Sequence, residues 1–245
     1  MVNEELLNDA GSVHPAKNIY TRYIKRILDV VLCVMAIVVL SPVFLVIWIL
    51  ELKYHGRPAL YHTIRPGLHD KEFKLYKFRS MTNECDEMGN LLPDKDRLTK
   101  FGHFIRKYSL DELPELINII KGDMSIIGPR PLLLEYLDIY KPRHRMRNLV
   151  RPGLACAKIK KQAGDTWTWG DQFENDIFYI ENLNFLTDVK MLFAIIREIL
   201  SADEFRAGAT RVPLTEETLF ETRTLEEMQI SVHYDSVQMN KKQDD

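Results

Sequence analysis

Residues 109–114 contain two adjacent carboxylates, Asp111 and Glu112, directly before an apolar pattern typical of a helix. A proline costs about 3 kcal/mol inside a helix, but not in the first turn, where its missing N–H has no intrahelical acceptor. We therefore favour Asp111 as the N-cap, with Pro114 in the first turn and the helix ending near Gly122. If Ser109 were the cap and Glu112 completed a capping box, Pro114 would lie in the helix interior. Both frames put the two acids at the positive end of a helix dipole, which favours anions.

Arg130 follows the acid pair in a stiff turn, because Pro129 and Pro131 fix their own φ angles and restrict the residues before them. A guanidinium on such a backbone suits bidentate phosphate binding. Together these residues predict a site in which acids and an arginine face an anionic substrate. Each feature also has an ordinary alternative. Asp111 could be only a helix cap with Glu112 as a solvated acid, and Arg130 could be an incidental arginine in a surface turn.

The site would lie beside a membrane, because residues 30–50 are almost purely apolar and about as numerous as a spanning helix requires. Ser41 and Pro42 stand at the midpoint of this segment, where Pro42 frees a carbonyl that the Ser41 hydroxyl can bond. Each half would then cross only about half of a bilayer.

Basic residues flank the apolar segment on both sides, so the positive-inside rule places both of its ends in the cytoplasm. We predict a re-entrant helix that bends at Ser41-Pro42 and leaves through the face by which it entered. An ordinary kinked transmembrane helix is the alternative. We expect Asp29, near the start, to lie near the interface or to pair with Lys25 or Arg26. The basic flanking residues are Arg22, Lys25, Arg26, Lys53 and Arg57.

The rest of the chain predicts short elements around the site. Alternation over 73–78 indicates a strand that could pair with 59–64 as a small hairpin. A short helix is expected over 101–108, after a charged loop at 82–100. The apolar stripes of 132–140 and 180–200 predict amphipathic segments, the second of which packs on the body or lies in the headgroup plane.

These elements make an α+β, mainly helical fold, with a re-entrant membrane helix, a small β-hairpin and amphipathic interfacial helices. We divide the chain into a flexible N-terminus (1–18), the membrane helix (19–55), a catalytic domain (56–200) and an acidic extension (201–245). The extension holds ten acids and five bases, whereas residues 1–200 hold 25 acids and 28 bases. A short helix is expected near 218–228.

Residues 141–161 hold eight Lys or Arg and no acid. Such a run can bind nucleic acid, anionic lipid or sugar nucleotides. No nucleic-acid-binding module or aromatic interleaving accompanies it, so lipid headgroups are favoured, with a solvated basic face as the alternative. Cys33, Cys85 and Cys156 have neither metal-ligand spacing nor a pairing pattern, which favours a reducing compartment.

From about residue 25 to residue 200 the chain resembles the bacterial sugar transferases, the monotopic phosphoglycosyl transferases in their small, single-catalytic-domain form. The resemblance rests on several motifs in a fixed order, which makes it far more specific than any one of them. The motifs are Lys25-Arg26 with Asp29, Ser41-Pro42, Arg65-Pro66-Gly67, Tyr76-Lys77-Phe78-Arg79-Ser80-Met81, Ser109-Leu110-Asp111-Glu112-Leu113-Pro114-Glu115-Leu116, Lys121-Gly122-Asp123-Met124-Ser125, Ile127-Gly128-Pro129-Arg130-Pro131 and Arg151-Pro152-Gly153.

The resemblance implies transfer of a phospho-sugar from a UDP-sugar to a polyprenyl phosphate such as undecaprenyl phosphate, with release of UMP and with Mg²⁺. It implies a monotopic protein on the cytoplasmic face of the bacterial inner membrane that initiates glycoconjugate synthesis. Asp111 would be the nucleophile, forming a covalent phosphosugar intermediate and contacting the metal, and Glu112 its partner.

Further residue roles follow from the same resemblance. Arg106 and Arg130 would clamp phosphate, and Lys77, Arg79, Pro129 and Pro131 would belong to the substrate-binding motifs. The partners implied are the UDP-sugar, the polyprenyl phosphate and lipid headgroups, and nucleic acid is not among them. The formation of homo-oligomers is left open.

The chain departs from the family after Gly153, where a Thr-Gly pair and a Gln-Val-x-Gly-Arg run are usual. Residues 154–164 read Leu-Ala-Cys-Ala-Lys-Ile-Lys-Lys-Gln-Ala-Gly instead. This departure keeps two other functions open. One is a membrane-bound hydrolase of nucleotide diphosphates, and the other is a non-enzymatic membrane scaffold in which the acid pair is only a cap.

Overall fold

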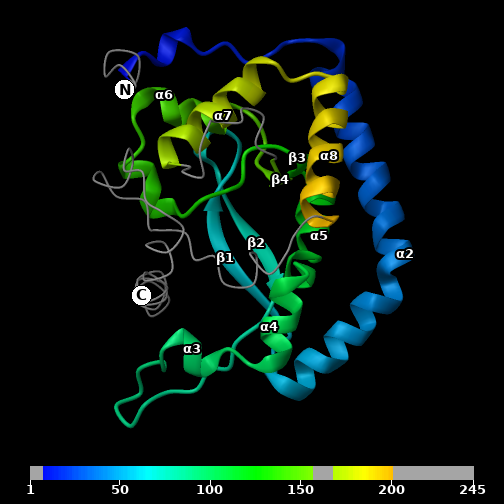
Figure 1. Cartoon of the computed structure of the whole chain (residues 1–245), viewed down its shortest axis with the longest axis vertical. Helices are drawn as coiled ribbons and strands as arrows, with labels where there is room; N and C mark the ends of the chain where they lie inside the picture. The colour runs from blue at the N-terminus through cyan, green and yellow to red at the C-terminus, as the bar shows by residue number, and fades with distance from the viewer. Residues whose placement is uncertain (1–7, 157–167, 201–245) are drawn as a thin grey trace.

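A long helix, α2 (Lys25–Tyr54), runs along one side of the structure, a computed structural model that describes residues 8–156 and 168–200 (Figure 1). A π-helical turn at Tyr20–Ile24 leads directly into it. Among the described helices this continuous segment is the one long and apolar enough to cross a membrane, and only 11% of its most apolar stretch is buried. The helix therefore presents most of its apolar surface to its surroundings.

The predicted break at Ser41-Pro42 is present as a bend, with the helix continuous through it (Figure 1). Pro42 cannot donate to the carbonyl of Val38, four residues back. The Ser41 hydroxyl donates to that same carbonyl at 2.8 Å, so the freed oxygen keeps a partner. The serine thus compensates locally for the bond that the proline removes.

The predicted hairpin is confirmed at the centre of the structure. Strands β1 (Leu60–Pro66) and β2 (Glu72–Phe78) pair antiparallel, with Leu60 opposite Phe78 and Pro66 opposite Glu72. Gly67 and a 3₁₀ turn at Leu68–Asp70 connect them. In this register Lys77, near the end of β2, lies opposite Tyr61, near the start of β1. Lys77 is therefore at the end of the hairpin that follows the C-terminal end of α2.

A second, parallel strand pair was not predicted. Strand β3 (Ser125–Ile127) pairs with β4 (Gly153–Ala155), with Ser125 opposite Gly153. The backbones of the two segments approach so closely that a Cβ on Gly153 would lie 2.1 Å from the Gly128 nitrogen. Glycine at this position is therefore a packing requirement.

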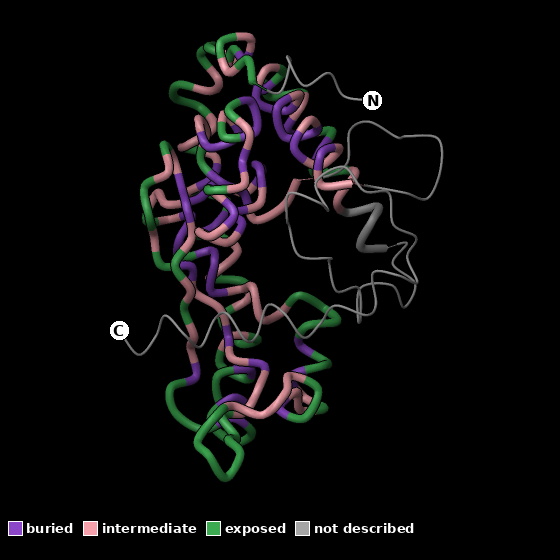
Figure 2. The backbone as a smooth tube through the Cα atoms, turned by 90° about the vertical axis from the view of Figure 1, so that its left-hand side faces the viewer, coloured by how far each residue is buried: buried purple, intermediate pink, exposed green. Residues whose placement is uncertain are grey.

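Three helices separate the hairpin from β3, and two of them were predicted. Helix α4 (Lys100–Lys107) confirms the expected helix, and α5 (Glu115–Lys121) follows the acid pair. The predicted loop at 82–100 contains one helical turn, α3 (Asp94–Arg97), which Arg97 closes by donating to the Asp94 carboxylate at 2.6 Å. Residues 83–90 of this loop are all exposed, as Figure 2 shows at the lower end of the molecule.

The C-terminal half is helical, but not with the predicted boundaries. The helix expected over 180–200 is present but begins later, as α8 (Phe185–Leu200), and the helix before it, α7 (Trp169–Glu181), was not predicted. The break lies at 182–184, where Asn184 accepts from the Thr187 N–H at 3.0 Å and so starts the second helix. Short turns at Leu134–Asp138, Pro142–Arg145 (α6) and Met146–Leu149 lead up to the pair, and Ala10–Ser12 forms a 3₁₀ turn near the N-terminus.

The amphipathic stripes pack mainly on the body. The stripe at 132–140 buries Leu132, Tyr136 and Tyr140 against Phe173 of α7. Met191 of α8 is buried with Ile177 and Ile180 of α7 and Ile127 of β3. Another face of α8 stays exposed, with Phe185, Leu186, Leu192 and Phe193 between 43% and 68% accessible.

Contacts distant in sequence attach α2 to the body, and they correct the predicted role of Asp29. Its carboxylate accepts from the Ser125 hydroxyl at 2.7 Å and from the Ile126 N–H at 3.1 Å. Lys25 pairs with Asp188 of α8, and Arg26 donates to the carbonyls of Ile119 and Ile120 at the C-terminal end of α5. Asp29 therefore does not pair with Lys25 or Arg26, because β3 passes close enough to supply its donors.

The basic run is largely neutralised where it is described. Arg143 pairs with Glu174 at 2.8 Å and Arg147 with Asp176 at 2.7 Å. Arg145 reaches Asp70 at 2.7 Å. These three arginines bind acids of the body and are therefore not free cations for lipid headgroups, whereas headgroup binding by the rest of the run stays a prediction. The remainder of the run, the altered loop at 157–164, residues 1–7 and the acidic extension lie outside the described residues.

His144 of α6 gives the fold a predictable pH dependence. The ring is fully buried, lies 4.7 Å from Phe173 between ring centres, and has no hydrogen-bond partner on either nitrogen among the described residues. Burial lowers the pKa of His144 to about 4, although Glu174 opposes the shift. The unfolded chain, with a pKa near 6.5, binds the proton more readily, so stability is complete above about pH 6.5 and falls towards pH 4.

We expect His144→Leu to remove the loss of folding stability that the wild type shows as the pH falls. Between pH 6 and 4.5 the unfolding free energy of the wild type should fall relative to the variant by up to about 1.4 kcal/mol per pH unit. Chemical unfolding in detergent at a series of pH values measures both slopes. Identical slopes in the two proteins would contradict a neutral, buried imidazole.

Candidate active site

The acid pair lies in a 3₁₀ turn, Leu110–Glu112, that links α4 to α5. Ser109 precedes it with φ of 53°, and its side chain makes no capping bond. Pro114 is the N-cap residue of α5, so the predicted role of Asp111 as the N-cap is wrong. The proline still avoids the helix interior, and Gly122 ends the helix with φ of 97°, as predicted.

Glu112 is held between two cations from different parts of the chain. Its Oε1 accepts from Lys77 Nζ at 2.8 Å and from the Arg130 guanidinium. Burial alone would raise the pKa of Glu112, but Arg130 and Lys77 together lower it to about 2. The carboxylate is therefore ionised, and its charge in turn raises the pKa of Arg130.

Glu115 is a third acid of the site, and sequence reasoning gave it no role. Its Oε1 lies 3.2 Å from Lys77 Nζ, and the residue is only 2% exposed. Burial raises the pKa of Glu115 to about 7, against the opposing charge of Lys77. The signal was its three-residue spacing from Glu112 at a helix start, which puts both acids on one side.

Asp111 differs from its neighbours because it has no ion-pair partner in the part of the chain that the structure describes. Burial raises the pKa of Asp111, and the charge of Glu112 adds to this, whereas Lys77 and Arg106 lower it. A half-buried carboxylate without a fixed partner keeps its oxygen lone pairs available. Of the three acids, Asp111 is the one free to react with or bind an electrophilic centre.

The remaining predicted basic residues, Arg106 and Arg79, have different neighbours. Arg106 of α4 donates through Nε to the Ser80 hydroxyl at 2.7 Å, and its charge acts on Asp111. Arg79 donates its backbone N–H to Ala59 at 3.2 Å and makes no ion pair among the described residues. Its charge helps burial to lower the pKa of His55. Arg79 thus faces a different group from the Lys77–Glu112 pair.

Hydrogen bonds to two carbonyls fix the backbone of the Pro129–Pro131 turn. The Gly153 N–H donates to the Pro129 carbonyl at 2.9 Å, and Arg147 donates to the Arg130 carbonyl at 2.8 Å. Arg147 is 2% exposed and pairs with the buried Asp176. The guanidinium of Arg130 is therefore presented from a fixed main chain.

A buried polar chain connects the end of α2 to the start of α4, near the site. Glu51 Oε2 lies 2.9 Å from His55 Nδ1, and His55 Nε2 lies 2.8 Å from Thr99 Oγ1. Thr99 also caps α4 by accepting from the Gly102 N–H at 2.9 Å. These hydrogen bonds hold α4, and with it Arg106, against α2. The sequence offered no pattern from which it could be inferred.

The donor set suits a magnesium ion that arrives with a substrate. Within residues 8–156 and 168–200, no group of three or more His, Cys, Asp or Glu could hold a metal. Glu112 and Glu115 are engaged by cations, which leaves the Asp111 carboxylate. Mg²⁺ commonly takes one or two protein carboxylates and completes its shell with substrate phosphates and water. Asp111 together with a diphosphate meets that requirement.

Comparison with known proteins places these residues in a family. The family model described as "Bacterial sugar transferase" matches residues 20–202. A sugar transferase named EpsL from Bacillus subtilis is 43% identical, over 74% of this chain and 89% of its own length.

Other relatives carry names that state an activity. The UDP-N-acetylgalactosamine-undecaprenyl-phosphate N-acetylgalactosaminephosphotransferase of Aeromonas hydrophila is 36% identical over 79% of this chain. The undecaprenyl-phosphate galactose phosphotransferase of Salmonella typhimurium is 33% identical over 75% of this chain. The chain spans 47% and 42% of their respective lengths, so the match lies in one part of each protein.

Proposed function

Because the chain belongs to the bacterial sugar transferase family, we propose that it transfers a phospho-sugar from a UDP-sugar to a polyprenyl phosphate and releases UMP. The proposal is supported most directly by the constellation of one unpaired carboxylate, Asp111, beside the Glu112–Lys77–Arg130 cluster. It agrees with the names of relatives that use undecaprenyl phosphate as acceptor.

The first step is attack by an Asp111 carboxylate oxygen on the phosphorus that carries the sugar. The bond from this phosphorus to the bridging oxygen breaks, and UMP leaves with that oxygen and its electron pair. The sugar phosphate is then bonded to Asp111. In the second step an oxygen of the polyprenyl phosphate attacks the same phosphorus, and the carboxylate of Asp111 is restored. One difficult displacement becomes two easier ones.

The basic residues stabilise the charge that both steps spread over phosphate oxygens. Arg130 offers its guanidinium from an anchored turn, and Arg106 approaches Asp111 from α4. Glu112 stays anionic and orients Arg130 and Lys77, so these cations are already placed before the substrate binds. Bound Mg²⁺ would be held by Asp111 and the diphosphate and would neutralise the charge that opposes the attack.

Magnesium binding should depend on the nucleotide. Since Asp111 is the only uncommitted acid of the cluster, we expect no measurable Mg²⁺ binding to this site by the protein alone at micromolar concentration. Addition of UDP, which supplies phosphate oxygens, should produce binding. Isothermal titration with and without UDP measures this difference, and Asp111→Asn is the control. Tight binding in the absence of UDP would mean that the protein has a complete metal site of its own.

We also propose that α2 is re-entrant and that the protein is monotopic on the cytoplasmic face. The Ser41-Pro42 bend and the basic residues on both flanks support this topology. The exposed apolar residues of α8 would lie in the headgroup plane beside it.

Cysteine labelling tests the topology directly. Cys85 is exposed on the C-terminal side of α2, and Lys17→Cys, made in a Cys85→Ser background, places a thiol on the N-terminal side. We expect a membrane-impermeant maleimide to label neither position in intact cells and both in inverted vesicles. Labelling of position 17 from outside would identify an ordinary spanning helix. Permeabilised cells provide the control for reactivity.

The reaction itself is tested with detergent-solubilised protein, undecaprenyl phosphate and a panel of UDP-sugars, by following UMP. We expect sustained UMP release only when the acceptor is present. Continuous release without acceptor would instead identify a hydrolase of nucleotide diphosphates.

A further inference from the structure

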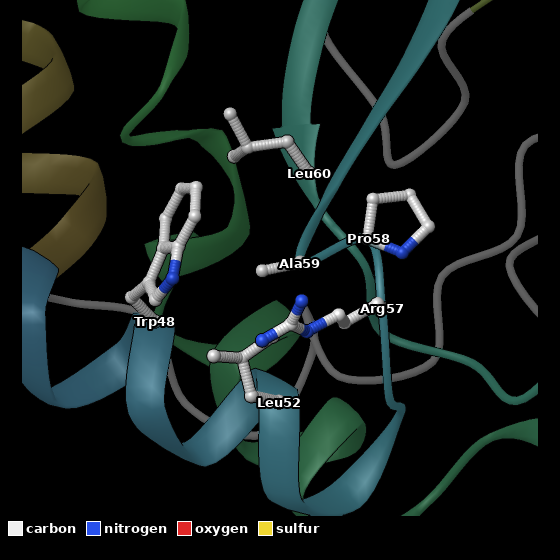
Figure 3. A pocket seen from close by; sticks show the side chains of 6 residues that line it. All are labelled: Trp48, Leu52, Arg57, Pro58, Ala59 and Leu60. Atoms are coloured by element: carbon white, nitrogen blue, oxygen red, sulfur yellow. The ribbon is translucent and has the colours of Figure 1, made fainter.

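A cavity of about 370 Å³ opens between the second half of α2 and the start of β1 (Figure 3). Its size falls within the range of roughly 300–1,000 Å³ that small-molecule sites occupy. Its walls are apolar except for one guanidinium, which Figure 3 shows extending across the space between the helix and the strand. The lining residues are Trp48, Leu52, Arg57, Pro58, Ala59 and Leu60.

The cavity lies beside the exposed apolar surface of α2. Trp48 and Leu52 belong to the apolar helix and are 42% and 37% exposed. A tryptophan near the end of a membrane helix commonly lies at the level of the lipid headgroups. Arg57 is exposed and makes no ion pair within the described residues. A ligand here would therefore have an apolar chain and an anionic head, since a free guanidinium favours phosphate.

One apolar cluster connects this cavity with the segment that carries the acid pair. Leu60 lines the cavity and also packs on the cluster of Ile47, Phe78 and Ile105. Leu110 and Leu113, which flank the acids in sequence, pack against the same cluster. In the backbone, the Ala59 carbonyl accepts from the Arg79 N–H at 3.2 Å. The cavity and the segment that carries the acid pair therefore border the same apolar cluster.

We propose that this cavity binds the isoprenoid units nearest the phosphate of the acceptor lipid, with Arg57 holding the acceptor phosphate. The inference rests on the proposed function and adds to it a binding site for the second substrate. The acceptor fits better than an ordinary phospholipid, because its phosphate must approach the same phosphorus that Asp111 attacks. Arg57 is a binding residue for the second step and takes no part in the first.

The test separates the two half-reactions. Arg57→Ala should raise the KM for undecaprenyl phosphate by about tenfold or more, because a charge-assisted contact to phosphate is lost. Formation of the phosphosugar adduct on Asp111 needs no acceptor, so its single-turnover rate should stay at the wild-type value. Lys53→Ala is the matched control, since it removes a cation from the same end of α2 outside the cavity, and it should leave the KM unchanged.

A second pair of variants tests the apolar part. Leu52→Trp fills the cavity from the helix and should also raise the acceptor KM, whereas Ile49→Trp adds the same bulk outside the cavity and should not. The proposal is overturned if Arg57→Ala changes the KM no more than Lys53→Ala does, or if both cavity variants slow adduct formation. Less co-purified phospholipid in Arg57→Ala with an unchanged KM would also overturn it and assign the cavity to a structural lipid. If wild-type protein forms no adduct at all, the proposed function fails instead.

Discussion

Asp111→Asn should reduce turnover by at least about 10³-fold and should abolish the phosphosugar adduct, because the amide cannot take the place of the carboxylate nucleophile. The change is nearly isosteric, and burial already disfavours the charged form of this side chain. The variant should therefore be at least as stable as the wild type. Quenched-reaction mass spectrometry of the intact protein, together with UMP release, measures the two activities.

Asp138→Asn is the matched control, because it removes an exposed acid of the same type that has no ion pair among the described residues. It should retain wild-type turnover and the adduct. Full turnover in Asp111→Asn would exclude this residue as the nucleophile. Loss of activity together with a large loss of stability would mean that the acid is structural, as the scaffold alternative requires.

The parts of the site that are local in sequence could be predicted, and those that depend on long-range pairing could not. The Ser41-Pro42 bend can be predicted because a proline removes the hydrogen bond to the carbonyl four residues before it. The hairpin can be predicted from a period-two pattern. The stiff Pro129–Pro131 turn follows from two prolines around one arginine. Each of these needs only a few neighbouring residues.

The errors arose where a distant segment supplies a partner. Asp29 accepts from Ser125 and Ile126, nearly a hundred residues away, rather than pairing with a neighbouring cation. Lys25 finds Asp188 for the same reason. Helix α7 was missed because it mixes apolar with acidic and amide residues, although Thr168 and Asp171 form a capping box at its start.

The basic run shows what this means for function. As sequence, eight cations without an acid indicate a surface for anions. In the fold, the acids arrive from α7 and from the hairpin connection, so the arginines become structural. The cations that remain available near the acids are those that the carboxylate of Glu112 holds in place. Charge counts along the chain therefore do not reveal that three of these arginines are paired, whereas the ordered motifs include the residues of the Lys77–Glu112–Arg130 cluster.

Arg147→Met should lower the free energy of unfolding by about 3–5 kcal/mol, because it leaves the carboxylate of Asp176 buried without its cation. The pair is almost inaccessible, with side chains 1% and 0% exposed. Thermal unfolding in detergent should show a fall in Tm of roughly 10 °C for a chain of this size. Arg145→Met is the matched control, since its partly exposed pair with Asp70 should contribute no more than about 1 kcal/mol.

The double variant Arg147→Met/Asp176→Leu separates stability from catalysis. Replacing both charges by apolar groups should recover most of the lost stability. It cannot restore the hydrogen bond from Arg147 to the Arg130 carbonyl, which fixes the backbone that carries the guanidinium proposed to bind phosphate. We therefore expect the double variant to be folded but to have a raised KM for the UDP-sugar. A stable double variant with wild-type kinetics would show that the Arg130 turn does not depend on the hydrogen bond from Arg147.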